Sequence, residues 1–172
     1  TMSWVFNVIW PSSMTWEYVD WFGAPKASYY DQKRAYEPLH VGAIFEELFT
    51  APGTEFRASL FVANDTRQTY QDALVQVRLY DITLNTIAEH QSRVTARAGR
   101  STPAGFFHWP VPKSAPDQVL FLCVELLDGA EGGLLSRSVY TPRVGTPVMK
   151  MPYFKEGPWI CEVGSTATEL VA

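Results

Sequence analysis

The ten residues Glu55–Asn64, EFRASLFVAN, carry the clearest strand signal in the chain. Every second position is apolar, through Phe56, Ala58, Leu60 and Val62. Because successive side chains of a strand point to opposite faces, this alternation predicts a strand with one face in a hydrophobic core.

Outward from this strand, a period of two recurs on both sides. It predicts six further strands: Leu39–Leu48, Asp72–Asp81, Thr86–Thr95, Ala104–Val111, Gln118–Leu127 and Leu135–Thr141. Gln118–Leu127 is nearly continuously apolar, which favours a central strand buried on both faces. Seven short strands separated by Gly, Pro, Asn and Asp predict a mainly β fold, an immunoglobulin-like antiparallel β-sandwich.

The N-terminal quarter has a different character. Residues 4–41 read WVFNVIWPSSMTWEYVDWFGAPKASYYDQKRAYEPLHV and are crowded with aromatic side chains. Met2–Trp10 is a short apolar run that ends at a proline, which predicts a largely buried strand. The segment Lys26–Tyr36 predicts a helix, and it should stop at about Tyr36 because the residue before Pro38 is pushed out of the α region.

This quarter resembles the end of the catalytic barrel of family-2 glycoside hydrolases, in particular the β-mannosidase and exo-β-glucosaminidase branch. In that family the last barrel strand reads roughly W-x-x-N-x-x-W-P, and an aromatic loop, a helix of the type P-K-x-x-Y-Y-x-x-K-R and a segment like E-P-L-H-V follow. The residues that match are Trp4, Asn7, Trp10 and Pro11; Asp20-Trp21-Phe22-Gly23; Pro25-Lys26, Tyr29-Tyr30 and Lys33-Arg34; and Glu37-Pro38-Leu39-His40-Val41.

The resemblance implies the first two of three parts. Residues 1–37 would be the end of the catalytic barrel (strand 8, aromatic loop and helix 8). Residues 38–145 would be the immunoglobulin-like sandwich. The sequence itself, punctuated by prolines, indicates that residues 146–172 are a C-terminal tail in which Val148–Phe154 could add an edge strand. By the same resemblance, Trp4, Asn7 and Trp10 would line the sugar-binding pocket of the parent enzyme, since barrel active sites lie at the C-terminal ends of the strands.

The catalytic residues of such an enzyme are not expected in this chain. Retaining glycosidases use one carboxylic acid as acid/base and another as nucleophile. In the family these precede the strand that Trp4 matches, and the chain contains no Asn-Glu pair. We therefore expect a non-catalytic C-terminal portion of a retaining exo-β-glycosidase, whose sandwich supports the barrel, and no hydrolysis by this chain alone.

The expected partners follow from the same interpretation. They are the remainder of the barrel and, through the parent, a glycan; no cofactor and no metal are expected, because no pair of histidines shows ligand spacing. Family resemblance favours a periplasmic or extracellular parent. Without its barrel neighbours, the segment Trp4–Tyr36 should expose apolar surface and either self-associate, fold back over the sandwich or lose part of its order.

Two other function classes remain open. A carbohydrate-binding module would need a row of solvent-facing aromatics, and the candidates are Trp16, Tyr18 and Trp21 in the N-terminal loop and Phe106, Phe107 and Trp109 in a strand. For both groups, burial at an interface or in the core is the favoured interpretation. A protein-interaction sandwich is the other alternative, and it leaves the match over Trp4–Val41 unexplained.

Composition excludes some partners. The formal net charge of −4 and the absence of a basic stripe argue against nucleic acid. No apolar run approaches the roughly 20 residues of a membrane span. Two cysteines, Cys123 and Cys161, do not make a disulfide framework, and whether they pair stays open.

Overall fold

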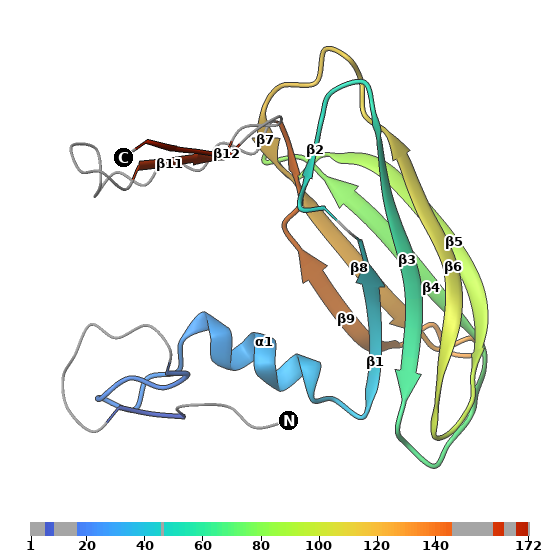
Figure 1. The fold of residues 1–172 in the computed structure, drawn as a ribbon. Coiled ribbons are helices and arrows are strands. Elements are labelled where there is room, and N and C mark those ends of the chain that lie inside the picture. Colours follow the sequence, from blue (N-terminus) through green and yellow to red (C-terminus); the bar gives the residue numbers. More distant parts are fainter. Residues whose placement is uncertain (1–5, 9–16, 46, 146–159, 164–167, 172) are drawn as a thin grey trace.

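The computed structural model describes residues 6–8, 17–45 and 47–145, and the backbone of 160–163 and 168–171. Two antiparallel sheets face each other in the sandwich (Figure 1). The three-stranded sheet has the order β1-β3-β6, with β1 Leu39–Ile44, β3 Glu55–Asn64 and β6 Arg100–Pro110. The four-stranded sheet has the order β5-β4-β8-β9, with β5 Thr86–Ala96, β4 Tyr70–Tyr80, β8 Phe121–Leu127 and β9 Leu134–Tyr140.

The predicted mainly β sandwich is confirmed, and most strand positions agree with it. The strand Glu55–Asn64 has the predicted bounds. Two predictions were too long: β1 ends at Ile44, and Leu120 separates a short β7 (Gln118–Val119) from β8. In both cases the chain leaves its sheet to pair elsewhere, since β10 (Arg143–Val144) joins β7 and β2 (Phe49–Thr50) in a small third sheet.

The core lies between the two large sheets. Val41, Leu60, Val77 and Leu122 have almost no exposed surface, and they come from one strand each of the inner faces. Asn64 is the main polar residue at one end of this core: its amide nitrogen donates to the carbonyls of Gln68 and Ala96, and its Oδ1 accepts from Thr66. This side chain ties the turn after β3 to the end of β5.

Side-chain hydroxyls form hydrogen bonds between the two sheets along both edges of the sandwich, and we call each of these lines of contact a seam. At the β1 edge, the Val41 N–H donates to Ser136 Oγ (3.1 Å), and Ser138 Oγ donates to the Val41 carbonyl (2.6 Å). The Ala43 N–H donates to the Tyr140 hydroxyl (3.0 Å). At the β6 edge, Ser92 Oγ of β5 donates to the Ala104 carbonyl (2.6 Å). The edge strands of the three-stranded sheet are thus bonded to the facing sheet through side chains rather than through a backbone ladder.

A β-bulge interrupts the pairing of β3 with β6. Phe61 pairs with Pro103 and Leu60 with Gly105, so Ala104 is an extra residue on β6. Gly105 has φ +98, a conformation that side chains rarely adopt. The bulge reverses the alternation of β6, because Ala104 and Phe107 are both buried although they are three residues apart.

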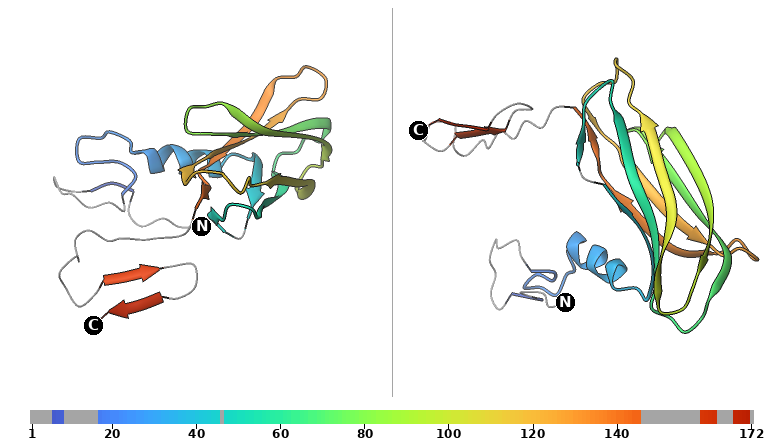
Figure 2. Two further views of the ribbon diagram at one scale, coloured as in Figure 1. Left: turned by 90° about the horizontal axis from the view of Figure 1, so that it is seen from above. Right: turned by 45° about the vertical axis from the view of Figure 1, so that its right-hand side comes forward.

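The N-terminal part contains the predicted helix. Helix α1 spans Ala27–Ala35 and is followed by Tyr36 as its C-cap. Before it, Val19 forms isolated bridges with Asn7 and with Pro25. None of the residues of α1 is buried, and the helix lies outside both sheets in the right-hand view of Figure 2. In the described part of the chain, no helix is long and apolar enough to cross a membrane.

In the C-terminal part, β11 (Ile160–Val163) and β12 (Thr168–Val171) pair antiparallel with each other. The segment Val148–Phe154, for which an edge strand was predicted, lies outside the described residues.

Candidate functional site

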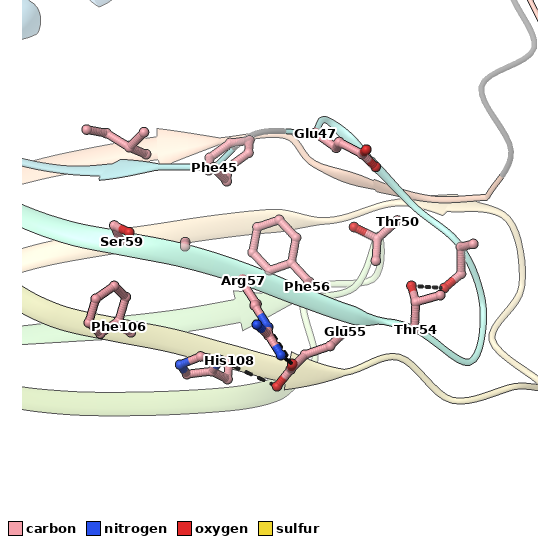
Figure 3. Close-up of a pocket in the computed structure, with 13 residues that line it drawn as sticks. Phe45, Glu47, Thr50, Thr54, Glu55, Phe56, Arg57, Ser59, Phe106 and His108 are labelled. Atoms are coloured by element: carbon pink, nitrogen blue, oxygen red, sulfur yellow. Dashed lines mark hydrogen bonds and ion pairs between the residues drawn. The ribbon is translucent and has the colours of Figure 1, made fainter. Parts of the chain in front are cut away.

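A hollow of about 710 Å³ lies beside β3, at the point where β1 ends and the chain turns away toward β2 (Figure 3). We call it the β3 groove; the lining residues that concern its chemistry are Ile44, Glu55, Arg57, Ser59, Phe106 and His108. The groove forms because the pairing of β1 with β3 ends at Ile44 and Ser59. The four residues of β3 from Glu55 to Ala58 continue along β6 without β1 beside them.

Three side chains form a row across the groove. Ile44 of β1 pairs with Ser59 of β3, and Ser59 pairs with Phe106 of β6. Ile44 is 64% exposed and Phe106 is 62% exposed. A small polar residue therefore lies between two large apolar side chains.

Charged groups occupy the adjacent part of the groove. Arg57 Nε donates to Glu55 Oε2 at 2.5 Å, and His108 Nδ1 lies 3.4 Å from Glu55 Oε1. The rings of Phe106 and His108 lie with their centroids 6.2 Å apart. Glu55 thus orients both a guanidinium and an imidazole beside the exposed phenyl ring, as Figure 3 shows.

This structure divides the three aromatics that the sequence grouped together in one strand. Phe107 and Trp109 are buried in the core, as the favoured interpretation predicted. Phe106 is exposed, and the bulge at Ala104 is the reason. Sequence reasoning missed Ile44, Arg57, Ser59 and His108 as site residues, because only the cross-strand register brings them together.

The N-terminal part presents a second surface. Its exposed aromatics, which we call the N-terminal aromatic surface, are Phe6, Trp21, Phe22, Tyr30 and Tyr36. Phe22 is 84% exposed and Trp21 is 48% exposed. The exposed apolar surface expected for this segment is therefore present in its described residues.

Of the predicted sugar-binding residues, one can be placed. Asn7 is exposed and bridges to Val19 in parallel orientation. Trp4 and Trp10 lie outside the described residues, as does Trp16 of the loop. Tyr18 is partly buried and donates its hydroxyl to Gln32 Oε1 of α1 at 3.4 Å.

A partly buried ion pair fixes the start of α1 to this loop. Glu17 is only 1% exposed, and its Oε1 pairs with Lys26 Nζ. The hydrogen bond from Lys26 lowers the pKa of the Glu17 carboxyl, against the opposing effect of burial. The pair therefore anchors the residue that precedes the helix.

The outer face of the four-stranded sheet carries a charge network. Glu125 of β8 accepts from Arg137 of β9 and lies 3.5 Å from Arg78 of β4. Cys123 is a free thiol on the same face, and burial together with Glu125 raises its pKa. Within residues 17–45 and 47–145, no group of three His, Cys, Asp or Glu side chains is placed to hold a metal ion.

Known proteins resemble the chain at two levels. A family model described as "Mannosidase Ig/CBM-like domain" matches residues 57–144, just over half of the chain. No curated protein sequence matches it.

Among solved structures, the exo-chitosanase CsxA of Amycolatopsis orientalis has a TM-score of 0.62 at 20% identity, covering 98% of this chain and 18% of that chain. A complex of a variant of that enzyme with PNP-β-D-glucosamine gives a TM-score of 0.61 at 20% identity, with the same coverage of 98% and 18%. A glycosyl hydrolase family 2 member of Bacteroides cellulosilyticus gives 0.50 at 15% identity, covering 66% of this chain and 15% of that chain. At these identities the likeness concerns the fold, and this chain spans less than a fifth of the length of either enzyme.

Proposed function

Because this chain belongs to the Mannosidase Ig/CBM-like domain family, we propose that it is the non-catalytic C-terminal portion of a retaining exo-β-glycosidase. Its sandwich supports a catalytic (β/α)8 barrel, most of which lies outside this chain. The observation that carries this proposal is the N-terminal aromatic surface. This segment exposes several aromatic rings, and its helix has no buried residue. Exposed apolar surface of this kind is typical of an element that packs against another part of a protein.

The proposal divides the chain as the sequence suggests. Residues 1–37 complete the barrel, residues 38–145 form the supporting sandwich, and residues 146–172 form a tail. The ion pair of Glu17 with Lys26 supports a structural role for the loop and α1, because it holds the two together without help from the sandwich. The remaining barrel would cover Trp21, Phe22 and the exposed face of α1.

In the whole enzyme, Trp4, Asn7 and Trp10 would form one wall of the sugar pocket. A tryptophan face suits the apolar C–H face of a pyranose, and an asparagine amide can bond to hydroxyls. The substrate would be a terminal β-linked sugar, either glucosamine or mannose, cleaved without a cofactor. The exo-chitosanase likeness supports glucosamine, and by resemblance the parent would act in the periplasm or outside the cell.

Hydrolysis of p-nitrophenyl β-D-glucosaminide and β-D-mannoside tests this proposal. The chain alone is compared with the product of the longest reading frame that encodes it. We expect the long form to cleave one of the two and the chain alone to cleave neither. Turnover by the chain alone would overturn the proposal, because its own acids would then have to supply the catalytic pair.

A second measurement tests the support role. In the long form, Phe22→Ala should lower thermal stability and activity together, because it removes a ring from the barrel contact. Ile82→Ala, which truncates an exposed apolar side chain in the turn between β4 and β5 of the sandwich, should leave both near those of the wild type. Equal behaviour of the two variants would argue against the N-terminal aromatic surface as the contact.

A further inference from the structure

We propose that the β3 groove binds an oligosaccharide, with one pyranose ring seated over Ser59 between Ile44 and Phe106. The inference goes beyond the support role and does not rest on it. It follows from the shape of the groove, from the way β6 presents Phe106 and from the charged groups beside the ring.

The row across the groove has the shape of a slot. Ile44, Ser59 and Phe106 lie side by side on three neighbouring strands. Strands in a sheet lie about 4.8 Å apart, so the two apolar walls stand about 10 Å apart at their backbones. The short side chain of Ser59 leaves the space between them open. A single six-membered ring fits between such walls, and both walls are more than half exposed.

The exposure of Phe106 depends on the β-bulge at Ala104. With regular alternation from the buried Ala104, Phe106 would also point into the core and Phe107 would point out. The bulge reverses this order, and Gly105 supplies the φ of +98 that accompanies it. Bulges commonly re-aim side chains next to functional sites. Among the Phe, Tyr and Trp side chains of the described sandwich, residues 39–45 and 47–145, Phe106 is the exposed one, whereas the others are buried or partly buried.

The charged groups select the chemistry of the ligand. Arg57 and Glu55 compensate each other, and His108 lies against the same carboxylate. A purely apolar ligand would remove water from these charges without replacing its hydrogen bonds, which is costly. A neutral, hydroxylated ligand can accept from the guanidinium and donate to the carboxylate while their ion pair stays intact. A pyranose combines such hydroxyls with an apolar C–H face for Phe106.

Binding is tested with the full chain. Backbone amide NMR spectra are recorded during titration with three neutral β-1,4-linked trisaccharides, made of N-acetylglucosamine, mannose or glucose. We expect at least one sugar to shift the amides around Ser59 and Phe106. Phe106→Ala should weaken that binding about tenfold or more, as truncation of a central aromatic anchor does.

Two further variants keep the test decisive. Ser59→Leu fills the slot from an exposed strand position, so the chain should fold and fail to bind. Phe22→Ala removes an equally exposed ring elsewhere and should bind as the wild type does. The proposal is overturned if none of the three sugars shifts a groove amide, if the shifts lie elsewhere, or if Phe106→Ala binds as well as Phe22→Ala. Failure here leaves the support role untouched, since that role is read from the activity and stability of the long form.

Discussion

The hydroxyl seam between β1 and β9 makes a quantitative prediction about stability. Val41 is completely buried, and both of its outward-facing backbone groups depend on β9: its N–H on Ser136 and its carbonyl on Ser138. Replacement of either serine by alanine leaves one of these groups unpaired in the interior. A buried backbone group without a partner costs about 1–3 kcal/mol.

Ser136→Ala and Ser138→Ala should therefore each lower the free energy of unfolding by about 1–3 kcal/mol. The double variant should lose about 2–5 kcal/mol, somewhat less than the sum if the two bonds at Val41 are coupled. Against a typical total of about 5–15 kcal/mol, this is a large fraction. Urea unfolding followed by circular dichroism measures it, and the m-value should stay constant because the folded surface is unchanged.

Ser101→Ala is the matched control, since Ser101 is an exposed serine on β6. It should change the free energy of unfolding by no more than about 0.5 kcal/mol. The reasoning is refuted if Ser138→Ala behaves like this control. In that case the Val41 carbonyl would have found another partner, and the seam would not depend on the hydroxyl.

Three further predictions concern single groups. Asn64→Ala should lower the free energy of unfolding by about 2–4 kcal/mol in the same urea assay, because the buried Asn64 side chain forms hydrogen bonds with several backbone groups. A loss below about 0.5 kcal/mol would contradict this prediction. Hydrogen bonds lower the pKa of Asp81 and of Asp128, so their ionised forms favour the folded state. Stability should thus be fully present above about pH 4, the ordinary range of aspartate, and fall as the pH drops further; Asp81→Asn should reduce this dependence in thermal melts, and an unchanged slope would argue against it. Burial raises the pKa of Cys123, so in a Cys161→Ser variant its reaction with DTNB at neutral pH should be slower than in the urea-unfolded chain, and an equal rate would show an accessible thiolate.

The fold could be predicted because its signal is local. The alternation over Glu55–Asn64 is complete within ten residues, and the strand has those bounds. The overlong prediction for β1 shows where local signals end. Apolar residues continue past Ile44, yet the chain turns to β2, whose partner β10 lies about a hundred residues further on. No sequence pattern near Ile44 indicates that β10 will pair with β2.

The β3 groove could not be predicted for the same physical reason. Ile44, Ser59 and Phe106 come from three strands. They lie next to one another only because of the register of strand pairing and the bulge in β6, and neither can be derived from local sequence. The sequence grouped Phe106 with Phe107 and Trp109, although a Gly beside two aromatics is a usable sign of a bulge. The N-terminal exposure could be predicted only through the family resemblance, because aromatic content alone favours burial and the expected barrel neighbours lie outside this chain.

The long sequence separation across the β1 seam also matters while the chain is being made. The hydroxyl partners of Val41 and Ala43 lie 95 to 97 residues further along. At a synthesis rate of about 5–20 residues per second, the ribosome needs about 5–20 s to add that length. During this interval the edge of β1 can accept no partner from its own β9, and an open strand edge pairs readily with other chains. Nascent chains stalled before β9 should therefore aggregate more than nascent chains stalled after Tyr140.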